Sequence, residues 1–487
     1  MGEAAPYSGS MSVPTSTAAP RILVVGGGYV GMYTSLRLLK KLRAGEAVVT
    51  VVDPRSYMTY QPFLPEAAAG AVSPRHVVVP LRRILRDAEV VTARVIEVRH
   101  ADRTAIVAPL EGEPYPIEYD HIVMAVGAVS RTLPIPGLAD WATGFKTVEE
   151  AIQLRNRVLE CLDIAESTNS PEIRERNLHF VVVGGGFAGV EALAELEDMA
   201  RYATRYYRHI APEDLKFYLV EAAGVILPEV GPEMGVKTLE QLRKRGIDVK
   251  LETRLESCVD GHVVLSDGTT FDAETVVWTA GVKASPVLQH TDLPLNEHGR
   301  LIADATLKVV GTDNAWGAGD GTAVPDLTTE DHRECAPNAQ HAVRQSKVLA
   351  DNIIAAVRGF PLHEYKHKYV GSVAGLGLFK GVANVYGIKL KGPIAWFMHR
   401  TYHVSRVPTV NRKARVIVDW TMALLFKREI VSLWSMHEPF LEFKEAASPS
   451  AAPKGHWEQH AQQAEEHLAS DAHTQDTGPA GSGTPAA

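Results

Sequence analysis

A short apolar run, a glycine-rich turn and a helix-forming segment follow one another at the start of this chain, and they limit the fold more than any other feature. The apolar run covers residues 21–25, the helix-forming segment covers 32–42, and a second apolar run, 47–52, ends at Asp53. The turn consists of Gly26, Gly27, Gly28, Tyr29, Val30 and Gly31. Such glycines permit a tight turn, close approach of backbone to a pyrophosphate and close helix packing. The unit predicts a dinucleotide site with Asp53 on a ribose diol, against the alternative of an ordinary glycine-rich turn.

The same unit occurs a second time, about 158 residues further along the chain. Residues 180–183 form its apolar run, and a later strand, 216–220, ends at Glu221. Its glycines are Gly184, Gly186 and Gly189. Two copies in one chain predict two separate dinucleotides. Because Glu221 stands where a ribose 2′-phosphate would lie, it favours NAD(H) over NADP(H).

Further strands and a third glycine-rich patch set the expected domain order. The strands 246–250 and 275–278 and the turn at Gly281 complete the second unit. The patch ends at Gly319 and Asp320 and precedes a helix predicted over 338–357. These features predict an α/β fold with two Rossmann-like domains, the second inserted into the first. The expected ranges are 21–145 and 291–385 for the split domain and 146–290 for the inserted one.

Residues 54–66 combine prolines with aromatic side chains. This composition is unfavourable for a regular helix or strand. It predicts an irregular loop that packs against a flat group such as a ring system, or else a surface loop with buried aromatic side chains.

Composition and charge exclude several other functions. The 487-residue chain has a formal net charge of −8, and nucleic-acid binding requires a basic surface. The three cysteines, Cys161, Cys258 and Cys335, form no C-x-x-C redox motif. The histidine spacing predicts no metal site. No apolar run approaches the ~20 residues of a membrane-spanning helix. Residues 1–20 lack the apolar core of a signal peptide and are expected to be disordered.

The segment 386–442 differs in character from the rest of the chain. It holds nine Lys and Arg residues against four Asp and Glu residues, a balance of +5. Two amphipathic helices are predicted in it, and His399 and His403 are interpreted as surface or interface residues. A basic amphipathic pair can bind an anionic membrane surface. The alternatives are packing on the protein itself or on a second subunit, which would make a homodimer. Residues 443–487 are expected to be disordered.

With these features the chain resembles the type II NADH dehydrogenases. These are single-subunit NADH:quinone oxidoreductases that pump no protons and belong to the two-dinucleotide-binding flavoproteins. The resemblance covers about residues 20 to 442. The glycine turns and the Gly-Asp pair are shared with many flavin reductases. More specific are the stretch Trp-Thr-Ala-Gly-Val at 278–282, the Ala-Gln stretch beginning at Ala339 and the basic C-terminal module.

The resemblance implies FAD on the first unit, NADH on the second and Glu191 as the catalytic glutamate near flavin and nicotinamide. It implies a peripheral protein on the cytoplasmic face of the cell membrane and a quinone, menaquinone or ubiquinone, at Gln340 and Arg344. The FAD contacts implied are Gly26, Gly27, Gly28, Tyr29, Val30, Gly31, Asp53, Pro54, Val95, Gly127, Gly319, Asp320, Ala339 and Lys389. The NAD contacts implied are Gly184, Gly186, Gly189, Glu221 and Gly281.

The chain departs from the family pattern in one place. The pattern Ala-Gln-x-Ala-x-Gln is replaced by a sequence with Arg344 at the last position and Gln345 one place later. An arginine can donate to a quinone oxygen, but it can also favour another electron acceptor. Three alternatives therefore stay open: a sulfide:quinone oxidoreductase using Cys335, a ferredoxin-type reductase, and a flavin-binding redox sensor without a respiratory role.

Overall fold

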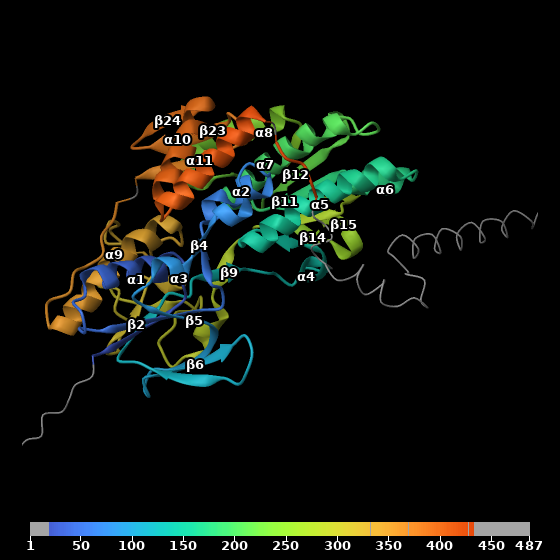
Figure 1. Cartoon of the computed structure of the whole chain (residues 1–487). Coiled ribbons are helices and arrows are strands. Elements are labelled where there is room, and N and C mark those ends of the chain that lie inside the picture. Colours follow the sequence, from blue (N-terminus) through green and yellow to red (C-terminus); the bar gives the residue numbers. More distant parts are fainter. Residues whose placement is uncertain (1–18, 332, 369, 427, 433–487) are drawn as a thin grey trace, which may run out of the picture. The chain divides into compact units, whose positions relative to one another are not determined.

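The computed structural model contains a mixed seven-stranded sheet, a parallel five-stranded sheet and a C-terminal antiparallel sheet with two helices, together with smaller sheets (Figure 1). The structure describes residues 19–331, 333–368, 370–426 and 428–432. The disorder expected at residues 1–18 and 443–487, and the end of the C-terminal module, 433–442, lie outside the described residues.

The first sheet has seven strands in the order β20-β8-β1-β2-β5-β6-β7, and its first five strands are parallel. Its valine and isoleucine runs are buried on both faces, as expected for parallel strands covered by helices. Residues 315–317 pair with residues 122–124, so the chain returns to its first sheet after completing the second. The first sheet is therefore built from two separate stretches of the chain, as the fold prediction requires, and the predicted domain bounds stay predictions. The elements are β1 (Arg21–Val25), α1 (Tyr29–Lys41), β2 (Val48–Asp53), β5 (Glu89–Arg99), β6 (Thr104–Pro109), β7 (Tyr115–Glu118), β8 (His121–Met124), β20 (Ala315–Gly317) and α9 (Ala339–Arg358).

The second sheet is wholly parallel, in the order β10-β17-β11-β12-β13. Helix α5 enters this unit through a capping box, in which Thr147 accepts from the Glu150 N–H and the Glu150 side chain accepts from the Thr147 N–H. The elements are β10 (Thr143–Gly144), α5 (Val148–Ser167), α6 (Pro171–Asn177), β11 (His179–Val183), α7 (Phe187–Ala203), β12 (Lys216–Val220), α8 (Pro232–Lys244), β13 (Ile247–Lys250) and β17 (Thr275–Trp278).

Smaller elements connect these units. An antiparallel pair, β9 and β18, lies where the chain passes between the two sheets. The remaining strands and short helices are β3 (Tyr57–Thr59), α2 (Leu64–Ala68), β4 (Val78–Pro80), α3 (Leu81–Ile84), β9 (Ala128–Ser130), α4 (Leu138–Trp141), β14 (Leu255–Ser257), β15 (His262–Leu265), β16 (Thr270–Asp272), β18 (Val282–Ala284), β19 (Leu301–Ile302) and β21 (Thr322–Ala323).

The expectation of an irregular loop at 54–66 was wrong in part. Strand β3 pairs with β4, and α2 begins with Pro65 in its first turn, where proline is tolerated because that N–H has no helical partner. Phe63 and Leu64 are buried, and α2 packs against α5 and α7. The segment therefore joins the first unit to the second.

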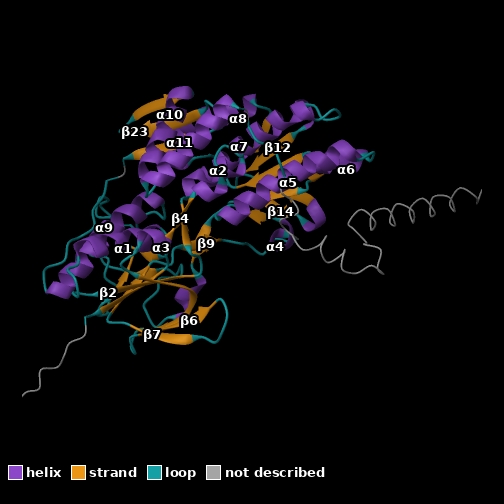
Figure 2. Ribbon diagram, viewed as in Figure 1, coloured by secondary structure: helices purple, strands orange, loops and turns teal. Residues whose placement is uncertain are grey.

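Both helices expected in the C-terminal module are present (Figure 2). Helix α10 packs on the antiparallel sheet β22-β23-β24, and α11 contacts α10. Among the described residues, no helix is long and apolar enough to cross a membrane. The elements are β22 (Gly371–Gly375), β23 (Gly381–Val385), β24 (Ile388–Lys391), α10 (Pro393–Arg406) and α11 (Val410–Leu425).

Candidate functional site

The first glycine turn is built so tightly that side chains are excluded from two of its positions. Gly26 has a φ of +102°, and a Cβ there would lie 2.5 Å from the Ala125 carbonyl oxygen. A Cβ at Gly31 would lie 1.7 Å from the Gly26 carbonyl oxygen. At Gly28, by contrast, a Cβ would meet nothing within 4 Å. Gly26 and Gly31 therefore serve the fold, and Gly28 leaves open space at the start of α1.

The second turn repeats this division of roles. Gly184 has a φ of +116°, and a Cβ at Gly189 would lie 2.0 Å from the Gly184 carbonyl oxygen. A Cβ at Gly186 would meet nothing within 4 Å. The two turns thus present the same open position at a helix N-terminus, where unpaired N–H groups attract anions.

Each turn is closed by the acid predicted for it. Asp53 Oδ2 accepts from the Gly27 N–H at 2.6 Å, and Glu221 Oε2 accepts from the Gly185 N–H at 2.5 Å. The other carboxylate oxygens accept from the backbone N–H groups of Arg55 and Ala223, both at 2.7 Å. Burial raises the pKa of Asp53, and the N–H groups of Gly27 and Arg55 oppose this shift. The two acids therefore fix the backbone of their turns, and their contacts with a ribose stay predictions.

The third patch lies against the first turn. A Cβ at Gly319, which has a φ of +78°, would lie 2.7 Å from Val30 Cγ2. The neighbouring Tyr29 hydroxyl is buried and has no hydrogen-bond partner among the described residues. Burial raises the pKa of Asp320, and the charges of Lys146 and Arg300 oppose this rise. An orphaned hydroxyl and a half-buried acid beside an open turn fit a polar ligand that completes their contacts.

The N-terminus of α9 carries the predicted quinone residues. Its cap is Asn338, whose Oδ1 accepts from the His341 N–H at 2.9 Å, and Ala339 is its first residue. Gln340 donates to the Gly371 carbonyl at 2.8 Å, and its own amide oxygen is buried with no hydrogen-bond partner in the described part of the chain. Arg344 donates to the Gln340 carbonyl at 3.1 Å.

The late glutamine has a defined place in this region. Gln345 is buried, and its amide oxygen accepts from the Gly319 N–H at 2.8 Å. The buried amide that contacts the glycine patch therefore belongs to Gln345 and not to position 344. The Arg344 guanidinium lies at the first turns of α9, where it donates to the Gln340 carbonyl.

Glu191 of α7 lies beside a histidine of the C-terminal module. Its Oε1 accepts from the Gly375 N–H at 2.8 Å, and His399 Nε2 lies 3.2 Å from the same oxygen. Burial raises the pKa of Glu191 to about 8. Burial, with a smaller contribution from the Arg400 charge, lowers the pKa of His399 to about 3. The surface interpretation of His399 was wrong, because the side chain is enclosed where α10 meets α7.

Other predicted residues lie in varied surroundings, and their cofactor contacts stay predictions. Lys389 on β24 pairs with Glu233 of α8. Val95 is buried in the apolar cluster behind the first sheet, and Pro54 follows β2 directly. Gly127 and Gly281 both have positive φ, at +63° and +95°, and end the turns after β8 and β17.

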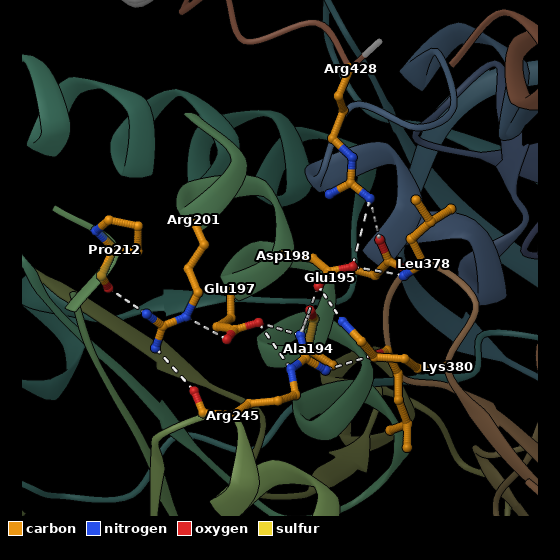
Figure 3. A network of polar contacts seen from close by, with 11 residues as sticks. Ala194, Glu195, Glu197, Asp198, Arg201, Pro212, Arg245, Leu378, Lys380 and Arg428 are labelled. Carbon is orange, nitrogen blue, oxygen red and sulfur yellow. Dashed lines mark hydrogen bonds and ion pairs between the residues drawn. The ribbon is translucent and has the colours of Figure 1, made fainter. Parts of the chain in front are cut away.

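A network that the residue pattern did not indicate joins the last part of the chain, from Leu378 to Arg428, to α2 and α7. The Arg400 guanidinium lies between the rings of Trp396 and Trp420, 4.3 and 4.6 Å from their centroids, with Nε 3.2 Å from Glu66 Oε1. Figure 3 shows the second part, in which Asp198 accepts from the Leu378 N–H and from Lys380, both at 2.7 Å. Acids at positions 191, 195 and 198 recur at helical spacing, so they lie on one face of α7. This spacing is the sequence signal from which the network could have been predicted.

A cavity of about 610 Å³ is lined in part by Gly371, whose carbonyl accepts a hydrogen bond from Gln340. This volume is in the range that binds a cofactor or substrate. Its lining residues are Pro228, Glu229, Gly231, Lys368, Val370, Gly371, Asn384, Tyr386 and Gly387.

Comparison with known proteins agrees with this geometry. The family model of the pyridine nucleotide-disulphide oxidoreductases matches residues 18–346. A type II NADH:quinone oxidoreductase of Staphylococcus aureus is 30% identical over 80% of this chain and 95% of its own. The type II NADH:quinone oxidoreductase Ndh of Mycobacterium tuberculosis is 28% identical over 84% of this chain and 89% of its own.

A solved structure of NDH2 from Plasmodium falciparum in complex with NADH shares the fold. It has a TM-score of 0.79 at 18% identity and covers 85% of this chain and 99% of its own. The chain therefore belongs to the pyridine nucleotide-disulphide oxidoreductase family and, within it, to the type II NADH:quinone oxidoreductases.

Proposed function

We propose that this protein is an FAD-dependent oxidoreductase that passes a hydride from NADH to the flavin and two electrons onward to a membrane quinone. The observation that carries the proposal is the pair of matched glycine turns, each open at one glycine and closed by an acid, in a chain of this family.

The residues at the first turn fit FAD. Open space at Gly28 admits a pyrophosphate to the N–H groups of α1, and Asp53 lies where an adenosine ribose would bind. The Tyr29 hydroxyl, which has no partner among the described residues, and the half-buried Asp320 would supply further polar contacts. At the second turn, Gly186 and Glu221 would hold NADH in the same way.

The chain's own groups orient the substrates and hold a proton. Glu191, with its raised pKa, carries a proton at neutral pH, and the Gly375 N–H fixes its orientation. A protonated carboxyl close to the reaction can serve as a general acid. We assign the quinone to the N-terminus of α9, where the Gln340 amide oxygen has no partner among the described residues and Arg344 supplies a cation. The 610 Å³ cavity lies next to this site, because its lining includes Gly371, whose carbonyl accepts from Gln340.

The sulfide alternative is disfavoured by the cysteines. All three are buried, and burial raises the pKa of Cys161 to about 12 and that of Cys335 to about 11. Attack on sulfur requires a thiolate, which such surroundings oppose.

Attachment to an anionic membrane is proposed for the C-terminal module. Helices α10 and α11 and the hairpin before them expose large apolar side chains close to Lys389, Lys391, Lys413 and Arg415. The cytoplasmic face and a homodimer through this module stay predictions. The exposed apolar residues are Tyr386, Ile388, Ile394, Phe397, Val410, Ile417, Val418, Met422, Leu424, Leu425 and Phe426.

The function is tested with flavin-loaded protein and NADH against ubiquinone and menaquinone analogues, with ferricyanide as the one-electron control. Reduction of a quinone well above the rate with oxygen is expected. In Arg344→Gln, the quinone KM should rise while the ferricyanide rate stays unchanged, because quinone binding uses the lost guanidinium donor and electron transfer to ferricyanide does not. Ferricyanide reduction without quinone reduction would instead support the redox-sensor or ferredoxin-type alternatives.

A further inference from the structure

We propose that His399 and His403 of α10 form a proton relay that reloads Glu191 from solvent during quinone reduction. The relay rests on the proposed function and assigns it residues from the C-terminal module, outside both nucleotide-binding units.

The groups lie in sequence from the buried acid outward. His399 Nε2 is 3.2 Å from Glu191 Oε1, and the rings of His399 and His403 are in edge contact, with centroids 4.5 Å apart. The Tyr60 hydroxyl lies 3.3 Å from His403 Nδ1. His399 is enclosed, while His403 is only partly buried and its ring also contacts that of Tyr402. The two histidines therefore form a contiguous row of side chains from the buried Glu191 to the half-buried His403 along one helix.

The spacing of the relay follows from helix geometry. Residues four apart on a helix lie on the same face, so the His399 and His403 rings meet edge to face along α10. A β-carbon at Gly375 would come 3.3 Å from His399 Cε1. The glycine therefore permits the ring to lie close to β22, next to the N–H that fixes Glu191.

The electrostatics suit transfer through neutral rings. Burial lowers the pKa of both histidines, and a neutral imidazole carries one N–H donor and one acceptor nitrogen, so it can accept a proton on one side and release one on the other. Arg400 faces His399 and disfavours a lasting positive charge there. The nearby acids Glu66 and Glu195 have raised pKa values from burial, with Arg400 and Arg428 opposing the rise.

The stoichiometry of the reaction requires the uptake of one proton from solvent. NADH, one proton and a quinone give NAD⁺ and a quinol. The hydride carries two electrons and one of the two hydrogens, and the second hydrogen comes from solvent as a proton. When Glu191 donates its proton, its carboxylate regains one from His399, which is resupplied by His403. Ferricyanide accepts electrons without a proton, so its reduction does not need the relay.

The first test is imidazole rescue of flavin-loaded His399→Ala. Stopped-flow bleaching of the flavin by NADH and ferricyanide reduction should match the wild type, while reoxidation by quinone should slow by roughly 10²-fold. Added imidazole should restore much of that rate. The control is His298, which is exposed and pairs with Glu297. His298→Gln should leave the bleaching, ferricyanide and quinone rates unchanged. An equal slowing with ferricyanide, or slowing without rescue, would overturn the relay.

The second test does not use turnover. The infrared C=O band of the protonated Glu191 carboxyl, identified by its loss in Glu191→Gln, is followed after transfer to D₂O. Its hydrogen exchange should slow at least tenfold in His399→Phe and His403→Phe relative to the wild type. Unchanged exchange would refute the relay even if quinone reduction is confirmed. Slowed exchange in a protein that reduces no quinone would support the path and reject the proposed function instead.

Discussion

Individual glycines divide between folding and binding. At Gly31 a β-carbon would lie 1.7 Å from the Gly26 carbonyl oxygen, whereas at Gly28 it would meet nothing within 4 Å. Gly31→Ala should therefore lower the unfolding temperature of the FAD-free protein, since the clash involves backbone. Gly28→Ala should leave that temperature unchanged but weaken FAD retention at least tenfold, measured by flavin fluorescence on dilution. Equal FAD retention in Gly28→Ala and wild type would contradict the cofactor assignment.

The acid at position 191 should make folding pH-dependent. Its pKa is about 8 in the folded protein against 4.5 for an ordinary glutamate, so the folded state binds the proton more tightly. This stability is fully present below pH 4.5 and is lost as the pH rises through about 8. Glu191→Gln should therefore match the wild type near pH 4.5 and exceed it at pH 8 by up to roughly 4 kcal/mol. Denaturant unfolding at both pH values measures this, and a pH-independent difference would show that Glu191 is not neutral when folded.

At the scale of elements, α10 and α11 have two separate faces. One face carries His399, Arg400 and Trp420 into contact with α7 and α2, and the other exposes Phe397 and Leu425, which are 64% and 69% accessible. Deleting the module would remove groups from the core as well as the outer face. A membrane test therefore requires point substitutions on the exposed face.

Phe397→Asp combined with Leu425→Asp should reduce flotation with anionic liposomes severalfold, because burying a charge in the interface is unfavourable. The matched control is Ile173→Asp on α6, a 44% accessible residue outside the module. NADH-dependent ferricyanide reduction should be unchanged in all variants. Flotation equal to the wild type would place the membrane contact elsewhere.

At the scale of the whole molecule, one apolar cluster runs through both nucleotide-binding units and the C-terminal helices. It includes Val24 of β1, Leu193 of α7, Leu349 of α9 and Trp420 of α11. Since these elements share one core, we expect residues 19–432 to unfold in one main transition. The two dinucleotides should then stabilise the same transition.

Saturating NADH, at 100 times its Kd, should stabilise the FAD-loaded protein by about 2.7 kcal/mol. Glu221→Ala should reduce the thermal shift produced by NADH and leave the shift produced by FAD unchanged, because Glu221 closes only the second turn. Asp53→Ala should do the reverse. Differential scanning calorimetry checks both variants. A loss of both shifts in either variant would show that the turns are not independent sites.

The sequence by itself determined the two sheets, their glycine turns and the acids that close them, because these depend on local patterns of glycine, apolar alternation and charge. The start of α9 was equally readable from Pro337 and the cap Asn338. Only the tertiary structure decided which side chains from distant segments meet. His399 lies 208 residues after Glu191, and Gln345, rather than Arg344, bonds to the Gly319 N–H. Helical spacing shows which residues share a face, but only packing determines whether that face meets water or a buried acid.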